Sequence, residues 1–136
     1  MRLRVSLHPN WEQLPVEKGP WAFKRRGLVA DNVLQLSFLE NKSGKSVAWS
    51  TEQMANVALQ QATGMGGRVS STTSGSCVFG KVAIVRFTTD KLVNCQTFVL
   101  HDDVHLITAT YFCAEQPSAE ELYEVEHIVS QLGLNQ

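Results

Sequence analysis

The sequence has almost no net charge, no long hydrophobic run and few cysteines, and each scarcity disfavours a class of protein. Its 136 residues carry 12 basic and 13 acidic side chains, for a formal net charge of −1. Such a chain lacks the broad positive field that nucleic-acid binders and proteins of the membrane surface use. No run approaches the ~20 apolar residues that a membrane-spanning helix needs. We therefore expect no membrane span, and nucleic acid is a disfavoured partner.

The cysteines and the N-terminus both bear on the compartment. Three cysteines are an odd number, so they cannot all form disulfides within one chain. The N-terminus does not resemble a signal peptide, because apolar and polar residues alternate after Arg4 instead of forming a continuous apolar run. Both features fit a reducing environment. We expect a cytoplasmic protein.

The composition allows one hydrophobic core. Of the 136 residues, 43% are hydrophobic, which is enough for a chain of this length to fold without disulfides or metals. We expect a single α+β domain over residues 1–136.

The few charges are unevenly distributed along the chain. Residues 1–26 hold six basic and two acidic side chains, and residues 115–136 hold five glutamates and no lysine or arginine. Charge runs usually belong to solvated surface, so the two ends either lie near each other or face solvent. The alternative is a binding face with two signs of charge.

Alternation of apolar and polar residues predicts strands in the first third of the chain. The predicted strands are 2–7, 21–25 and 33–39. In the first, Leu3, Val5 and Leu7 share a face. Residues 11–20 contain two prolines and a glycine, which predict an irregular connection, and residues 43–45 predict a turn.

A capping box formed by Ser50 and Gln53 predicts a helix over 51–62 that Gly64 ends in the left-handed conformation. Its inward stripe is Met54, Ala55, Ala58, Leu59 and Ala62. After Glu52 the helix has no charge, and its polar residues are Gln53, Asn56, Gln60 and Gln61. An uncharged polar face suits contact with a protein, although short Ala/Gln helices also occur on ordinary surfaces.

Two hairpins are predicted after this helix. One has Gly80 at the first position of a type II′ turn. The other joins 92–101 to 104–113 through a two-residue turn, Asp102-Asp103, which would place Leu100 opposite His105.

A second capping box, Ser118 with Glu121, predicts a closing helix over 119–132 that ends at Gly133. The order of strands, helix, four strands and helix predicts a largely antiparallel sheet of about six to seven strands with both helices packed on it.

The hairpin register decides whether cysteines and histidines can share a site. In the predicted register Cys95 and His101 lie on one face of the sheet, and His105 and Cys113 lie on the other. Divided ligands disfavour a zinc site, and the length of chain between His105 and Cys113 disfavours a catalytic pair. We therefore expect no metal, no cofactor and no catalytic residue. A register error of one residue would reopen these possibilities.

The cluster Lys24-Arg25-Arg26, with Trp11 and Trp21 nearby, is a further candidate for contact with an anion or nucleic acid. A solvated strand end is the simpler explanation, because the aromatic residues are predicted to point inward. The loop Gly64-Met65-Gly66-Gly67 does not predict a phosphate site, since it follows a helix instead of opening one.

Several of these segments together resemble the PsbP-like superfamily, which has an α/β/α sandwich fold. They are Pro9-Asn10-Trp11, the capped helix from Ser50, the hairpin Cys77-Val78-Phe79-Gly80, the stretch from Phe98 through the Asp-Asp turn to Tyr111, and the helix ending Ile128-Val129-Ser130-Gln131-Leu132. The resemblance implies a protein that binds other proteins and is not an enzyme. Bacterial relatives include chaperones of type VI secretion effectors, which act as dimers that shield apolar helices of a toxin.

We expect a non-enzymatic protein-binding module, such as an effector chaperone, an adaptor or an immunity-like protein. The partner would be another protein or a second copy of the chain. The candidate contact residues are Gln53, Asn56, Gln60 and Gln61 of the helix and Lys24, Arg25 and Arg26 of the basic cluster. The alternative is a small-molecule-binding or enzymatic domain with a pocket between sheet and helices, where His101 or His105 supplies the polar group. Nucleic-acid binding comes third.

Overall fold

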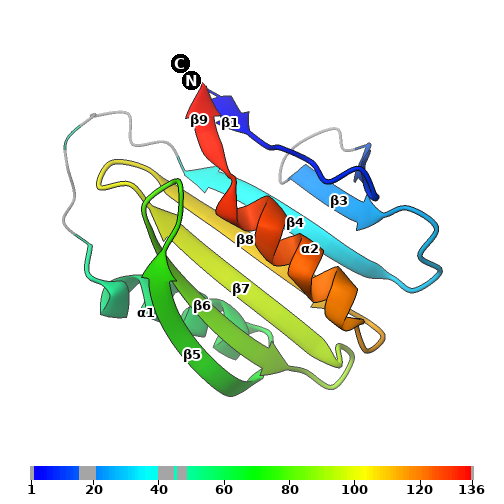
Figure 1. The fold of residues 1–136 in the computed structure, drawn as a ribbon. Helices are drawn as coiled ribbons and strands as arrows, with labels where there is room; N and C mark the ends of the chain where they lie inside the picture. Colours follow the sequence, from blue (N-terminus) through cyan, green and yellow to red (C-terminus); the bar gives the residue numbers. More distant parts are fainter. Residues whose placement is uncertain (1, 16–20, 40–44, 46–48, 136) are drawn as a thin grey trace.

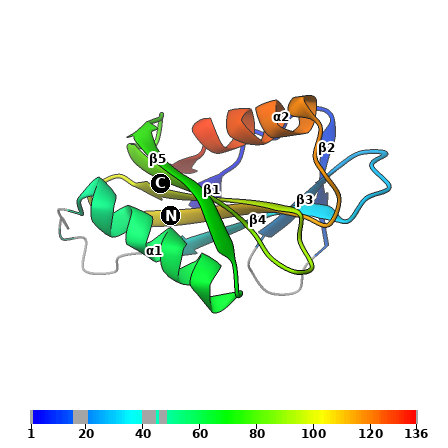
Figure 2. The same ribbon diagram turned by 90° about the horizontal axis from the view of Figure 1, so that it is seen from below.

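The computed structural model describes residues 2–15, 21–39, 45 and 49–135, in which two helices cover opposite faces of a seven-stranded sheet (Figures 1 and 2). The strand order is β2-β3-β4-β8-β7-β6-β5, and every neighbouring pair is antiparallel. The strands are β2 (Trp11–Leu14), β3 (Trp21–Arg25), β4 (Asn32–Leu39), β5 (Arg68–Ser76), β6 (Lys81–Thr88), β7 (Asn94–His101) and β8 (Leu106–Cys113). The predicted α+β sandwich is confirmed.

The two ends of the chain form a small second sheet. β1 (Arg2–Arg4) pairs antiparallel with β9 (Gly133–Asn135), so the termini lie side by side (Figure 1). The predicted strand over 2–7 was too long, but Leu3, Val5 and Leu7 do pack against the same core as predicted. β9 was missed, because three residues are too few to show an alternating pattern.

The expectation of an irregular segment over 11–20 was wrong in its first part. Residues Trp11–Leu14 form β2, whose Trp11 is buried and pairs with Arg25 of β3. The prolines that suggested a loop do not lie in this strand: Pro15 follows its last residue, and residues 16–20 lie outside the described part of the chain. The predicted turn over 43–45 also lies outside it, apart from Lys45.

Both predicted helices and both capping boxes are confirmed. α1 is Thr51–Gly64 and α2 is Ala119–Ser130. The Ser50 Oγ accepts from the Gln53 backbone at 3.1 Å, and the Gln53 Oε1 accepts from the Ser50 backbone at 2.8 Å. α1 ends later than predicted. Gly64, which was expected to be the left-handed residue after the helix, is its last helical residue, and the positive φ of 71° belongs to Gly66. α2 ends earlier, at Ser130.

The β7–β8 connection differs from the predicted two-residue turn. Leu100 pairs with Ile107 and not with His105, so four residues, 102–105, form the connection. The Asp102 carboxylate orders them by accepting from the backbone of Val104 at 3.0 Å and of His105 at 2.6 Å. The register is therefore shifted by two residues, and an even shift leaves every side chain on its predicted face.

The β5–β6 turn also differs in detail. Cys77 and Gly80 exchange backbone hydrogen bonds of 2.8 and 3.2 Å, so Val78 and Phe79 form the turn and Gly80 follows it. A glycine is needed there because φ is 153° and an added Cβ would collide with the His101 carbonyl oxygen.

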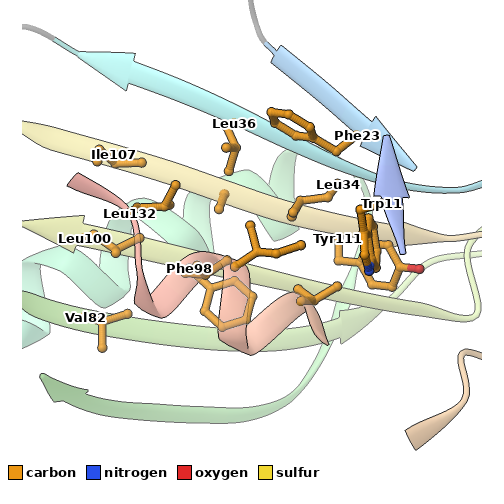
Figure 3. Packing of buried hydrophobic residues seen from close by; sticks show 14 of the residues in the cluster. Trp11, Phe23, Leu34, Leu36, Val82, Phe98, Leu100, Ile107, Tyr111 and Leu132 are labelled. Atoms are coloured by element: carbon orange, nitrogen blue, oxygen red, sulfur yellow. The ribbon is translucent and has the colours of Figure 1, made fainter. Parts of the chain in front are cut away.

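Each face of the sheet has its own core. The α2 side buries the larger cluster, which extends from Trp11 beside Tyr111 to Val82 at its other end (Figure 3). The α1 side buries Met54, Ala58 and Ala62 of the helix against β6 and β7. These are inward residues that the sequence predicted for α1.

Candidate functional site

The basic cluster is paired within the chain. The Arg25 Nε lies 2.8 Å from Glu124, and its guanidinium also lies 3.1 Å from Glu120 of α2. Lys24 lies 3.7 Å from Asp31, and Arg26 lies 3.5 Å from Glu12. Through Arg25 the basic N-terminal part therefore meets the acidic C-terminal helix, which was one of the two simpler explanations of the charge pattern. Contact of these cations with a partner stays a prediction.

Glu124 is the centre of this pairing. Its carboxylate accepts from Asn10 Nδ2 at 2.9 Å, Trp11 Nε1 at 3.0 Å and Arg25 Nε at 2.8 Å, and His8 Nε2 lies 3.8 Å away. The residue is only 3% exposed. Burial alone would raise the pKa of Glu124, but the hydrogen bonds from Asn10, Arg25 and Trp11 outweigh it and lower the pKa. This network attaches α2 to β2 and β3 and gives Glu124 a structural role.

Glu121 lies in a second structural network. It accepts from Tyr111 Oη at 2.8 Å and from Asn32 Nδ2 at 3.1 Å, besides forming the capping box with Ser118. Burial and then the hydrogen bond to Glu121 raise the pKa of Tyr111, which keeps the phenol neutral. Every buried side-chain nitrogen and oxygen of the described residues has a hydrogen-bond partner. These groups stabilise the fold.

The amides predicted for the outer face of α1 are divided between two roles. Gln53 completes the helix cap, and Gln61 is turned to the sheet, where its Nε2 donates to Thr110 Oγ1 at 3.1 Å. The expectation that Gln61 belongs to the outer face was wrong, because its partner Thr110 lies on β8 of the sheet that α1 covers. Asn56 and Gln60 are exposed. Together with Trp49, Gln53 and Val57 they line a shallow hollow of about 200 Å³.

The two histidines singled out from the sequence lie in different places. His101 is buried on the α1 side and stacks on Trp49, with ring centroids 5.6 Å apart. His105 is buried against the edge of Phe38, also at 5.6 Å. It lines a cavity of about 390 Å³ with Arg4, Asp102 and apolar residues of the β5–β6 turn and of the segment after α2.

The buried cysteines lie on opposite faces of the sheet. Cys95 belongs to the α1-side core and Cys113 to the α2-side core. Burial raises the pKa of both thiols, that of Cys113 to about 12, so both are protonated at neutral pH and are poor nucleophiles. Within the described ranges, no three His, Cys, Asp or Glu side chains are grouped to hold a metal ion. Neither described helix has the length and apolar character needed to cross a membrane.

The outer edge of β5 is a feature that the sequence analysis missed. The strand has nine residues, and all except Ser71 are exposed. β6 pairs with one side of it, and among the described residues no backbone hydrogen bond reaches its other side. From Val69 to Ser76 the strand contains no charged residue and no proline. The run of serine and threonine was the signal that could have revealed a strand with two solvent-exposed faces.

Comparison with known proteins identifies a related fold. No family model and no curated protein matches the sequence. Among solved structures, the chain is similar to the solution structure of cyanobacterial PsbP (CyanoP) from Synechocystis sp. PCC 6803, with a TM-score of 0.65 and 11% sequence identity. The match covers 98% of this chain and 92% of the cyanobacterial chain. An identity this low relates the folds alone. The chain has a PsbP-like fold, as the sequence resemblance predicted.

Proposed function

We propose that this protein is a non-enzymatic protein-binding module, and that it holds an extended segment of a partner protein along β5. The observation that carries the proposal is the open edge of this strand. An unpaired edge presents a row of backbone donors and acceptors, to which another strand can add.

The composition of β5 supports this proposal. Sheet edges are normally protected by charged side chains, prolines, short length or bulges. β5 has nine residues, and its one irregularity lies between Val69 and Ser71, near its start. The stretch from Thr72 to Ser76 has none of these protections, and its side chains are small and uncharged. Such a module could serve as an adaptor, an immunity-like protein or an effector chaperone in the cytoplasm, depending on its partner.

The test uses peptides as defined probes. A displayed library of random 12-residue peptides is selected on the wild-type protein, and the enriched peptides are then measured against Thr72→Lys, since a lysine on an edge strand opposes strand addition. Selected peptides should bind the wild type, fail to bind Thr72→Lys, and shift the amide resonances of β5. Peptides that bind both proteins equally, or that shift only α1 residues, would contradict the proposal and return attention to Asn56 and Gln60.

A second candidate function is small-molecule binding in the cavity beside His105. Its volume of about 390 Å³ lies within the range of ligand pockets, and Arg4, Asp102 and His105 supply polar groups within an apolar lining. A thermal-shift screen tests it, because a ligand at 100 times its Kd stabilises the fold by about 2.7 kcal/mol. A hit that His105→Ala abolishes would support this function, and a screen without hits would not.

A further inference from the structure

The side of β5 that faces α2 leads into an apolar cleft. Ser71, Thr73 and Gly75 pair with Arg86, Ile84 and Val82 of β6. Residues paired across two strands share a face of the sheet, and Val82 and Ile84 belong to the α2-side core. Gly75 therefore lies on the α2 side, while its neighbour Ser74 lies on the α1 side.

The cleft lies between β6 and α2, next to the end of β5. Its volume is about 210 Å³. Most of its lining is apolar (Cys77, Val82, Ile84, Phe98 and Val129), and Ser76, Glu126 and Ser130 complete it. This volume is below the roughly 300–1,000 Å³ of sites for drug-sized molecules. It suits one side chain better than a cofactor.

Gly75 pairs with Val82, which lines the cleft, and places no side chain between Val82 and the free edge of the sheet. A Cβ added at Gly75 meets no atom within 4 Å, and φ there is not positive, so neither crowding nor backbone conformation requires a glycine. A strand added to β5 would lie about 4.8 Å from it. A long side chain on that strand can extend across Gly75, because Gly75 has no side chain and a Cβ built there meets no atom within 4 Å.

We propose that the partner segment pairs with β5 and inserts a long apolar side chain, Phe, Leu or Met, across Gly75 into this cleft. The inference rests on the proposed function, and it names the chemistry of the partner. A second copy of the chain fits less well. From Ser70 to Ser76 its own β5 offers only Ser, Thr and Gly, and Val69 pairs with Phe87 on the α1 side, so two copies paired through this edge would leave the cleft unfilled.

The experiment compares two leucine substitutions on neighbouring residues. Gly75→Leu places an apolar side chain in the entrance of the cleft, and Ser74→Leu places the same side chain on the opposite face as a matched control. The probes are the 12-residue peptides selected on the wild type. They should share a long apolar residue at one position, and its replacement by alanine should weaken binding about tenfold or more. Gly75→Leu should weaken binding to a similar extent, and Ser74→Leu by less than about twofold.

The half-buried thiol of Cys77 gives a second measurement, because it lines the cleft. Bound peptide should slow the alkylation of Cys77 in the wild type and should have no such effect in Gly75→Leu. Unchanged thermal unfolding of both leucine variants shows that folding is intact.

The outcomes separate this inference from the proposed function. If Thr72→Lys abolishes peptide binding and Gly75→Leu does not, edge pairing stands and the cleft inference is overturned. If neither substitution affects binding, or if the selection enriches no peptide, both fail. A wild-type protein that dimerises through β5 and excludes the peptides would also overturn the inference, in favour of a second copy.

Discussion

The two edges of the sheet are built in opposite ways. β2 has four residues, its Trp11 is buried, and Pro15 follows its last residue. β5 has nine residues and is exposed along almost its whole length. Arg26 and Glu12 form an ion pair beside β2, whereas β5 has no charge beyond Arg68. Length, burial and charge protect the first edge and leave the second edge open.

The same core supports both edges. Its α2-side cluster extends from Trp11 to Val82, so β2 lies near one end and the cleft beside β5 lies at the other (Figure 3). At the β2 end, Glu124 attaches the helix to the strands through four partners. At the β5 end, Arg86 of β6 forms an ion pair of 3.5 Å with Glu126 of α2, and both side chains are at the surface. The buried polar contacts of α2 are therefore concentrated at the β2 end, and the proposed binding edge lies at the other end.

The largest expected effect comes from removing the buried carboxylate. Glu124→Ala should lower the free energy of unfolding by about 3–5 kcal/mol, because Arg25, Trp11 and Asn10 lose their shared acceptor. Glu126→Ala is the matched control on the same helix, and the loss of its exposed ion pair should cost less than about 1 kcal/mol. Urea denaturation measures both. Equal losses would remove the distinction between the two ends.

Acidification should weaken the β2 end in the same way. The pKa values of Glu121 and Glu124 are lowered from 4.5 in the folded protein, so the unfolded chain binds more protons as the pH falls through this range. The stability that these carboxylates contribute is complete above pH 4.5 and is lost as the pH falls through their folded pKa values. Urea midpoints measured against pH should show this decline. In Glu124→Gln the decline should be shallower, and an unchanged slope would contradict the role of Glu124.

A smaller effect is expected at the turn that positions β5. Gly80→Ala should cost about 1–3 kcal/mol, because φ is 153° and the added Cβ meets the His101 carbonyl oxygen. Gly75→Ala is the control, since its Cβ meets nothing and the change should stay within about 0.5 kcal/mol. Thermal unfolding of the two variants tests this. A neutral Gly80→Ala would show that the turn can relax.

Thr72→Lys should have the smallest effect on stability and the largest effect on peptide binding. Thr72 is exposed on the open edge, so Thr72→Lys should change the free energy of unfolding by no more than about 0.5 kcal/mol. It should nevertheless abolish binding of the selected peptides. A variant that unfolds as readily as Glu124→Ala would show that β5 is a structural edge.

Local signals in the sequence predicted the helices and most of the strands. The features that could not be predicted depend on contacts between residues far apart in the chain. The capping boxes that begin at Ser50 and Ser118 predicted both helices, because such a motif is contained in four consecutive residues and can be recognised in the sequence. The Glu124 network could not be predicted, since its partners Asn10 and Trp11 are 114 and 113 residues away. The cysteines were assigned to the correct faces despite the wrong register, because the error was an even number of residues. The open edge of β5 depends on the strand order, and alternation within one strand carries no information about its neighbours.

Hydrogen exchange at the amides of β5 tests the central claim most directly, because exchange reports which backbone N–H groups have partners. In the free protein, the β5 amides that point away from β6 should exchange rapidly, while those of β7, between two strands, exchange slowly. A selected peptide with a long apolar residue should slow exchange at β5 and leave β2 unchanged. Protection that appears at β2 or α1 instead, with β5 unaffected, would contradict the account.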